Sequence, residues 1–222
     1  MELNAQLIHN LKALGIQHYF GVTGGGVIHF AKYLKKYPQE NQQPSFVLIN
    51  EYAAGFAPIG YYLTSGKVAA CLVTTGAAEK LACIGLSDAR FMNIPAVYLL
   101  ALHSAVNELK YPIQDISYQG MNLIAQIKAE LPNQVFVIDS ASSITPIMHN
   151  IEDTIGRSQP AVVFFRPEVL CATSTTTQWL PSLISSPIQQ DKIALMLDTI
   201  VQQAKNARII VMANTEAVTS NL

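Results

Sequence analysis

The sequence predicts an α/β protein: a doubly wound, mainly parallel sheet of about six strands with helices on both faces. The first observation is that short apolar runs alternate, over residues 1–170, with segments whose apolar residues recur every three or four positions. The second is that strands alternating with helices need right-handed crossovers, which make the strands parallel. The third is composition, because 50% of the 222 residues are hydrophobic and only 13% are charged, which indicates much buried surface.

Six apolar runs are predicted strands, and the periodic segments between them are predicted helices. The strands are expected at 19–22, 46–49, 68–74, 96–102, 135–138 and 161–165. The helices are expected at 3–14, at 27–37, from Glu51 onward, from Gly76 to about Phe91, at 120–130 and at 144–155. Because the run at 46–49 has four apolar residues in succession, it is expected to be a buried strand.

Three segments lie outside this alternation. Residues 103–120 are polar and aromatic without a clear period, which predicts a long loop, and such loops are usually functional or mobile. Residues 171–187 are rich in Ser and Thr and indicate a linker, with Trp179 docked on a surface. Residues 188–222 contain one periodic helix and one apolar run, which together cannot bury their apolar faces. We therefore expect a first domain at 1–170 and the truncated beginning of a second domain at 188–222.

Composition argues against several classes of protein. The net charge is −1 and no basic run occurs, so no nucleic-acid partner is expected. No apolar segment reaches about 18 residues and no signal peptide is apparent, so a cytoplasmic protein without a membrane partner is predicted. Cys71 and Cys83 lie in apolar runs and are expected in the core. The five histidines lack ligand spacing, so no metal site is predicted in this chain.

The candidate site residues follow three predicted strands. The first strand leads into a glycine turn, Thr23–Gly26, the second into Glu51, and the third into a threonine turn, Thr74–Gly76. Ligands of open α/β sheets bind just beyond the carboxyl ends of strands. Each feature also has a purely structural explanation: the glycines can form a tight turn, and the threonine hydroxyls can cap a helix.

Glu51 has two explanations of its own. An acid at a helix start is favoured by the helix dipole, by about 0.3–1 kcal/mol. Alternatively, its neighbours Ile49, Ala53 and Ala54 shield it from water and raise its affinity for a proton. Two further residues are candidates for the ligand edge: His103, after the fourth strand, and Gln119, at the end of the long loop.

The residues around these strand ends resemble the N-terminal pyrimidine-binding domain of the thiamine-diphosphate-dependent enzymes, the superfamily of acetolactate synthase and pyruvate decarboxylase. The family's Gly-Val-Pro-Gly-Gly, Glu-x-Ala-Ala and Thr-Ser-Gly-Pro-Gly correspond to residues 21–25, 51–54 and 74–78. Its downstream Gly-x-x-Asp-Ala and Phe-Gln-Glu elements correspond to Gly85-x-x-Asp88-Ala89 and Tyr118-Gln119-Gly120. The resemblance covers about residues 1–170, so the linker would lead into the central domain of that family.

The resemblance implies roles for the candidate residues. Glu51 would hydrogen-bond the ring nitrogen N1′ of the aminopyrimidine and so promote loss of the thiazolium C2 proton, after which the cofactor attacks a 2-keto acid. The cofactor-binding residues would be Gly24, Gly25, Glu51, Thr74, Thr75 and Gly76. Gln119 would reach towards the substrate. Magnesium and the diphosphate would be held by a C-terminal domain whose Gly-Asp-Gly…Asn-Asn pattern does not occur in this chain.

The sequence also departs from the family pattern. Thr23 replaces a proline, and Ala77 and Ala78 replace a Pro-Gly pair. The implied function is the pyrimidine-binding part of an acetolactate synthase-like enzyme, a transferase or lyase that is inactive alone. The alternatives are the pyrimidine-binding subunit of a 2-keto acid decarboxylase, which Asn50 favours, and a non-catalytic homologue. The expected partners are a second copy in a homodimer or larger homo-oligomer, and the cofactor-binding domain of another subunit. The small residues of the Glu51 helix suit packing across such a dimer.

Overall fold

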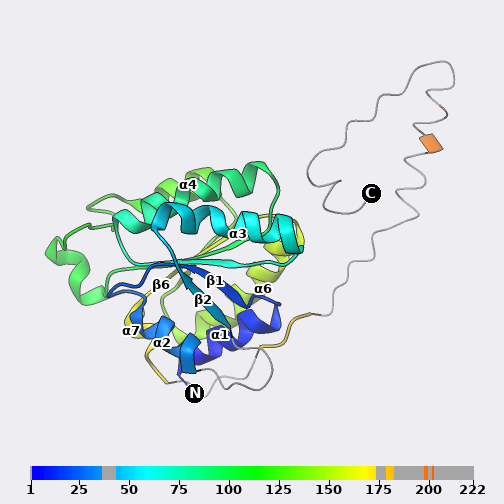
Figure 1. The fold of residues 1–222 in the computed structure, drawn as a ribbon. Coiled ribbons are helices and arrows are strands. Elements are labelled where there is room, and N and C mark those ends of the chain that lie inside the picture. The colour runs from blue at the N-terminus through cyan, green and yellow to red at the C-terminus, as the bar shows by residue number, and fades with distance from the viewer. Residues whose placement is uncertain (1, 37–43, 174–178, 183–197, 200–201, 203–222) are drawn as a thin grey trace. The chain divides into compact units, whose positions relative to one another are not determined.

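A computed structural model of the chain describes residues 2–36, 44–173, 179–182, 198–199 and 202 (Figure 1). The chain divides into two compact units, Met1–Pro181 and Ser182–Leu222. The predicted second domain at 188–222 lies almost entirely outside the described residues, so its helix and strand stay predictions. All the predicted site residues belong to the first unit.

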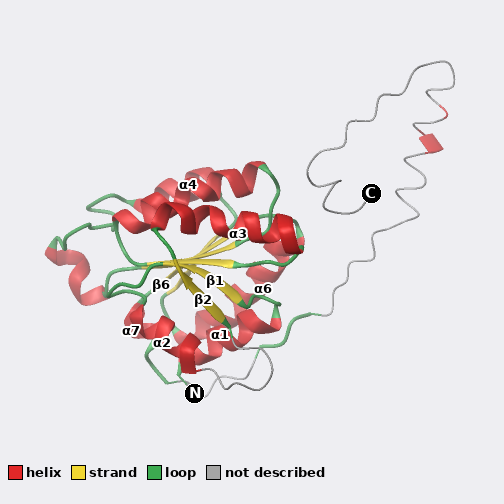
Figure 2. Cartoon of the chain, in the orientation of Figure 1, coloured by secondary structure: helices red, strands yellow, loops and turns green. Residues whose placement is uncertain are grey.

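The first unit is built on a six-stranded sheet in which every pair of neighbouring strands is parallel. The strand order is β2-β1-β3-β4-β6-β5. The strands are β1 (His18–Gly21), β2 (Ser45–Leu48), β3 (Ala70–Val73), β4 (Val97–Ala101), β5 (Val135–Ile138) and β6 (Ala161–Phe165). The predicted doubly wound α/β fold is therefore confirmed (Figure 2). The bounds of β5 and β6 are the predicted ones.

Helices cover both faces of this sheet. They are α1 (Leu3–Ala13), α2 (Ile28–Lys36), α3 (Glu51–Ser65), α4 (Ala77–Phe91), α5 (Leu123–Glu130), α6 (Ile144–Gly156) and α7 (Pro167–Leu170), with short 3₁₀ turns at Ala105–Lys110 and Ala141–Ser143. Figure 1 shows α3 and α4 over one face and α1, α2 and α6 over the other. One buried cluster joins α1, α2 and α6 to the sheet, and a second joins α3, α4 and α5 to its opposite face.

One small residue of α3, Gly55, lies in close contact with α4. A Cβ on Gly55 would lie 2.1 Å from the Ala82 carbonyl oxygen of α4, and one on Gly85 would lie 2.1 Å from the Gly55 carbonyl oxygen. The Tyr98 hydroxyl of β4 donates to the same Gly55 oxygen at 2.8 Å. Gly55 and Gly85 therefore let α3 pack closely against α4, because backbones approach this closely only where side chains are absent. Gly60 of α3 is exposed, with no atom within 4 Å of its Cβ position, so packing of the small-residue face across a dimer stays a prediction.

Two local predictions were wrong. The run at 46–49 is not a buried strand: β2 lies at the edge of the sheet, and Val47 and Leu48 are 41% and 61% exposed. An apolar run alone does not distinguish an edge strand from a central one. The segment 103–120 is not entirely loop, because it contains the 3₁₀ turn Ala105–Lys110. The short helix α7 was not predicted from the sequence; Pro167 begins it just after the last strand, at a helix position where its missing N–H costs nothing.

Trp179 is docked, as predicted. It is 3% exposed, and its indole N–H donates to Nδ1 of His149 on α6 at 3.2 Å. The two rings meet edge to face with centroids 5.7 Å apart. Cys71 is buried within the second cluster, as expected, and burial raises the pKa of its thiol. Cys83 is partly buried against that cluster, and burial raises the pKa of its thiol to about 12.

Candidate functional site

The three predicted site elements lie at neighbouring strand ends. The strand order places the carboxyl end of β1 between those of β2 and β3. The Ile49 amide after β2 donates to the Gly21 carbonyl oxygen at 3.0 Å, which ties the approach to Glu51 to the end of β1. Glu51, the glycine turn and the threonine turn therefore occupy one edge of the sheet, where open α/β folds bind ligands.

The glycine turn packs against the threonine turn. A Cβ on Gly24 would lie 2.5 Å from Thr74 Oγ1, and one on Gly26 would lie 2.6 Å from the Ala101 Cβ. The Gly26 amide donates to Thr74 Oγ1 at 3.3 Å. Glycine is needed at these two positions because Thr74 and Ala101 of the same chain leave no room for a Cβ atom.

Gly25 is different from its neighbours. A Cβ at this position would have no atom within 4 Å, and its φ lies outside the left-handed range. Neither packing nor backbone conformation within this chain therefore requires glycine at 25. The turn presents this stretch of backbone openly to a group from outside.

The threonine hydroxyls tie strand ends together and do not cap α4. Thr75 Oγ1 donates to the Ala101 carbonyl oxygen at the end of β4, at 2.7 Å, while Thr74 Oγ1 accepts from Gly26. The residue that caps α4 is Glu79: its Oε2 accepts from the Gly76 amide at 2.9 Å, and its own amide donates to the Gly76 carbonyl oxygen at 3.1 Å. The structural explanation by threonine caps is thus wrong.

Glu79 was not among the residues predicted from the sequence. It is fully buried, and burial raises the pKa of its carboxyl to about 9, although the hydrogen bond from Gly76 opposes this shift. Its second oxygen, Oε1, is buried without a hydrogen-bond partner among the described residues. The spacing of a capping glutamate three residues after Gly76 was the available signal.

Glu51 occupies the first turn of α3 with its carboxylate unpaired. Asn50 is the N-cap, and its Oδ1 accepts from the Ala53 amide at 2.9 Å. The Glu51 carboxylate makes no hydrogen bond or ion pair with any residue that the structure describes. Its side chain is half-buried, so the shielding expected from Ile49, Ala53 and Ala54 is only partial in this chain.

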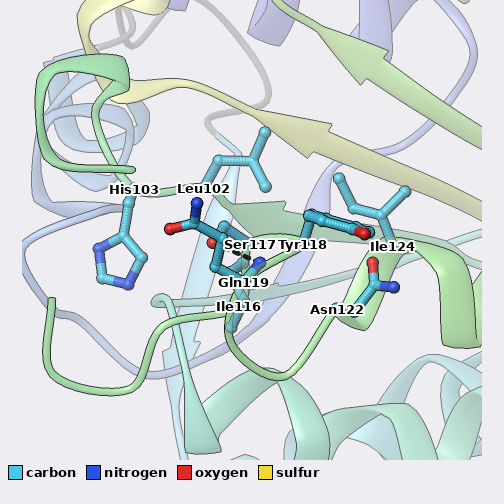
Figure 3. Close-up of a pocket in the computed structure, with 8 residues that line it drawn as sticks. All are labelled: Leu102, His103, Ile116, Ser117, Tyr118, Gln119, Asn122 and Ile124. Atoms are coloured by element: carbon cyan, nitrogen blue, oxygen red, sulfur yellow. Dashed lines mark hydrogen bonds between the residues drawn. The ribbon is translucent and has the colours of Figure 1, made fainter. Parts of the chain in front are cut away.

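Gln119 lies in a cavity of about 310 Å³ next to the end of β4 (Figure 3). The cavity is lined by Leu102, His103, Ile116, Ser117, Tyr118, Gln119, Asn122 and Ile124. His103 thus faces this edge of the sheet, as predicted. The lining does not include Glu51, Gly25 or the threonine turn, so the chain brings Gln119 together with His103 and not with the predicted cofactor-binding residues.

Metal-binding and membrane-spanning features are both absent from the part of the chain that the structure describes. Its residues contain no cluster of three or more histidine, cysteine or acidic side chains that could hold a metal ion. Among the same residues, no helix has the length and apolar character needed to cross a bilayer.

An open parallel sheet with a carboxylate and two tight turns at adjacent strand ends defines a ligand-binding α/β domain. Over residues 1–121, the sequence matches the family described as thiamine pyrophosphate enzyme, N-terminal TPP binding domain. The match covers more than half of the chain, which therefore belongs to this family of enzymes that depend on thiamine diphosphate.

Curated relatives are acetolactate synthases. The chain is 25% identical over 179 residues to the acetolactate synthase isozyme 2 large subunit of Escherichia coli (strain K12), covering 80% of this chain and 31% of the relative. It is 25% identical over 165 residues to acetolactate synthase of Arthrospira platensis, covering 69% and 28%. It is 33% identical over 92 residues to acetolactate synthase of Mycobacterium avium, covering 41% and 14%. The chain therefore spans about a third or less of the length of these relatives.

Proposed function

We propose that this chain supplies the pyrimidine side of a thiamine diphosphate site in an acetolactate synthase-like enzyme, a transferase or lyase that decarboxylates a 2-keto acid and joins the product to a second one. The observation that supports it best is that two features occur at neighbouring strand ends: the Glu51 carboxylate and the open backbone at Gly25. Among the described residues the Glu51 carboxylate has no hydrogen-bond partner and Gly25 has no packing contact that requires glycine, and both features suit an aromatic ring entering from outside.

The residues present fit this cofactor. When bound, thiamine diphosphate supplies a carbon nucleophile for the keto group. Glu51 would share a proton with the ring nitrogen of the aminopyrimidine, and this bond becomes stronger as water is excluded. Gly24, Gly25 and the threonine turn Thr74–Gly76 would shape the surface under the ring, while Gln119 would face the substrate.

The remainder of the site would come from another domain. The described residues offer no metal cluster, and the diphosphate pattern of the family does not occur among the 222 residues. We therefore assign magnesium and the diphosphate to the cofactor-binding domain of another subunit in a homo-oligomer. Half-exposure of Glu51 supports this assignment, because a partner that covers the carboxylate would complete its shielding. A cytoplasmic location remains part of this proposal.

The test uses a tagged copy purified from its native cell together with the chains that accompany it. The assembly is stripped of magnesium and thiamine diphosphate with a chelator and assayed for release of carbon dioxide from pyruvate. We expect the activity to disappear and to return only when both are added. Activity that survives stripping, or that neither addition restores, would argue against the proposal.

A companion experiment addresses the half-site. Residues 1–222 alone are titrated calorimetrically with magnesium and thiamine diphosphate. We expect no turnover of pyruvate and no binding at micromolar concentration. Micromolar binding by the isolated chain would show that it contains a complete cofactor site.

Two alternatives remain distinguishable. Asn50 favours a decarboxylase subunit, and in the structure its side-chain oxygen accepts from the Ala53 amide and caps α3. A non-catalytic homologue is favoured by the Gln114 side chain, which lies against Gly76 in the threonine turn. Release of carbon dioxide without a joined product would indicate the decarboxylase, and no release from several 2-keto acids would indicate the non-catalytic protein.

A further inference from the structure

One side chain fastens the connection between β4 and α5, residues 102–122, to the first turn of α4. Gln114 Oε1 accepts a hydrogen bond from the amide of Ala77, the first residue of α4, at 3.0 Å. The same side chain lies over Gly76, where an added Cβ would be 2.1 Å from Gln114 Oε1. Glycine at 76 is therefore required both by this contact and by its φ of +100°.

The backbone of Gln114 continues the link towards the cavity. Its carbonyl oxygen lies 3.2 Å from His103 Nε2, and the His103 carbonyl oxygen accepts from Arg166 Nη1 at 3.0 Å. His103 lines the cavity that contains Gln119 (Figure 3). Gln114 thus joins α4 to one wall of this cavity.

Gln114 also precedes the turn that carries other lining residues of the cavity, among them Ser117 and Gln119. Asp115 Oδ1 accepts from the Ser117 amide at 2.9 Å, and the Asp115 carbonyl oxygen accepts from the Met121 amide at 2.7 Å. Hydrogen bonds from Ser117 lower the pKa of the Asp115 carboxyl from its ordinary value. Residues 115–121 are therefore a locally bonded turn, and the Gln114 side chain is its attachment to α4.

The backbone of the connection adopts an unfavourable conformation at this attachment. Gln114 has a φ of 60° and Tyr111 a φ of 48°, in the left-handed region that residues with side chains avoid. This conformation occurs at the residue whose side chain contacts α4. The Gln114 side chain contacts the first turn of α4, and its carbonyl oxygen contacts His103 in the cavity. A shift of α4 relative to this connection would therefore also move His103.

We propose that Gln114 is a positioning residue: its side-chain amide holds the connection on α4 and thereby sets where His103 and Gln119 lie in the cavity. This inference depends on the proposed function in one respect, namely that the ligand of the cavity is a 2-keto acid. The contact itself depends on an N–H at residue 77, which a proline would lack.

That dependence gives a clean test. Ala77→Pro removes the N–H at a helix position where proline is well tolerated, so α4 is preserved. Gln114→Asn keeps an amide and tolerates the left-handed backbone, but it is one methylene too short to reach. Gln134→Ala, remote from the connection, is the control. In residues 1–222, hydrogen exchange of amides within 104–116 should be about fivefold faster in either variant, as expected for loss of one hydrogen bond.

Two further measurements distinguish a residue that positions His103 from one that only fastens the connection: hydrogen exchange of the double variant Ala77→Pro/Gln114→Asn, and the NMR signals of the His103 ring. The double variant should exchange no faster than either single one, because both remove the same bond. The ¹⁵N shifts of the His103 ring should move towards those of a free imidazole in both single variants. In the active assembly, the KM for pyruvate should rise several-fold with little change in kcat. Unchanged exchange would overturn the proposal, and so would faster exchange with an unmoved His103 signal. Because neither of these readouts needs activity, failure of the proposed function would be recognised separately.

Discussion

The two sides of the candidate site are built differently, although both lie at the carboxyl edge of one sheet. The glycine and threonine turns after β1 and β3 are in direct contact, with no room for a Cβ at Gly24 or Gly26. In the connection after β4, side-chain oxygens of Gln114 and Asp115 accept hydrogen bonds from the Ala77 and Ser117 amides, and some residues adopt the left-handed conformation. From this comparison we expect a rigid, preformed surface on the side proposed to bind the cofactor and an adjustable wall on the side proposed to face the substrate.

The largest expected effect concerns the buried acid under the rigid side. The Glu79 carboxyl has its pKa raised by burial from 4.5 to about 9 in the folded chain. Between these values the folded state binds one proton more than the unfolded state, so the free energy of unfolding falls as the pH rises, by about 1.4 kcal/mol per pH unit. Urea unfolding at pH values of about 5.5 and 8.5 measures this slope.

Glu79→Gln should abolish that pH dependence, because a neutral amide can accept from the Gly76 amide at every pH. Asp88→Asn, which removes an exposed carboxyl from the same helix, is the matched control and should keep the slope. If the unfolding free energy of the Glu79→Gln variant depends on pH as steeply as that of the unaltered chain, the Glu79 carboxyl is not the source of this dependence, contrary to this account.

The next effect separates two adjacent glycines on the rigid side. Gly24→Ala places a methyl group 2.5 Å from Thr74 Oγ1 and should destabilise the fold by about 1–3 kcal/mol. Gly25→Ala places it in open space and should change stability by less than about 0.5 kcal/mol. In the active assembly only Gly25→Ala should weaken cofactor affinity without a cost in stability. Equal destabilisation by both would remove the distinction between packed and open glycines.

On the adjustable side, Gln119→Ala should affect binding and leave stability nearly unchanged, since the side chain is exposed at the cavity. Loss of one hydrogen bond to a charged substrate predicts an increase in KM for pyruvate of about tenfold. Steady-state kinetics of the active assembly would measure it. A similar fall in stability and in activity would mean that Gln119 supports the fold.

The smallest effect concerns the backbone of the connection. Tyr111 is 75% exposed with a φ of 48°, so Tyr111→Asn should relieve strain and raise the free energy of unfolding by up to about 1 kcal/mol. Tyr118→Asn is the matched control, because Tyr118 is 85% exposed and its φ is not positive. Equal changes in the two variants, measured by urea unfolding, would indicate that the conformation at 111 is not strained.

The sequence was informative where local pattern determines structure. Alternating apolar runs predicted all six strands, and the strand-end rule predicted that Glu51 and the two turns are neighbours. The sequence was uninformative where contacts between residues far apart in the chain determine the structure. The edge position of β2, the packing of α3 on α4 through Gly55, and the contact of Gln114 with Ala77 across 37 residues depend on strand order and loop path. The burial of Glu79 belongs to the same group, because a helix-start acid is usually exposed.

The central claim is that the unpaired carboxylate of Glu51 serves an incoming aromatic ring. The most direct measurement is the rate of carbon dioxide release from pyruvate by the native assembly carrying Glu51→Gln. The control carries Asp139→Asn, an exposed carboxyl that follows β5, at the opposite end of the strand order from β2. We expect a loss of about 10²-fold or more for Glu51→Gln, with an unchanged unfolding curve for residues 1–222, and no loss for the control. A Glu51→Gln assembly that retains full activity would contradict the account.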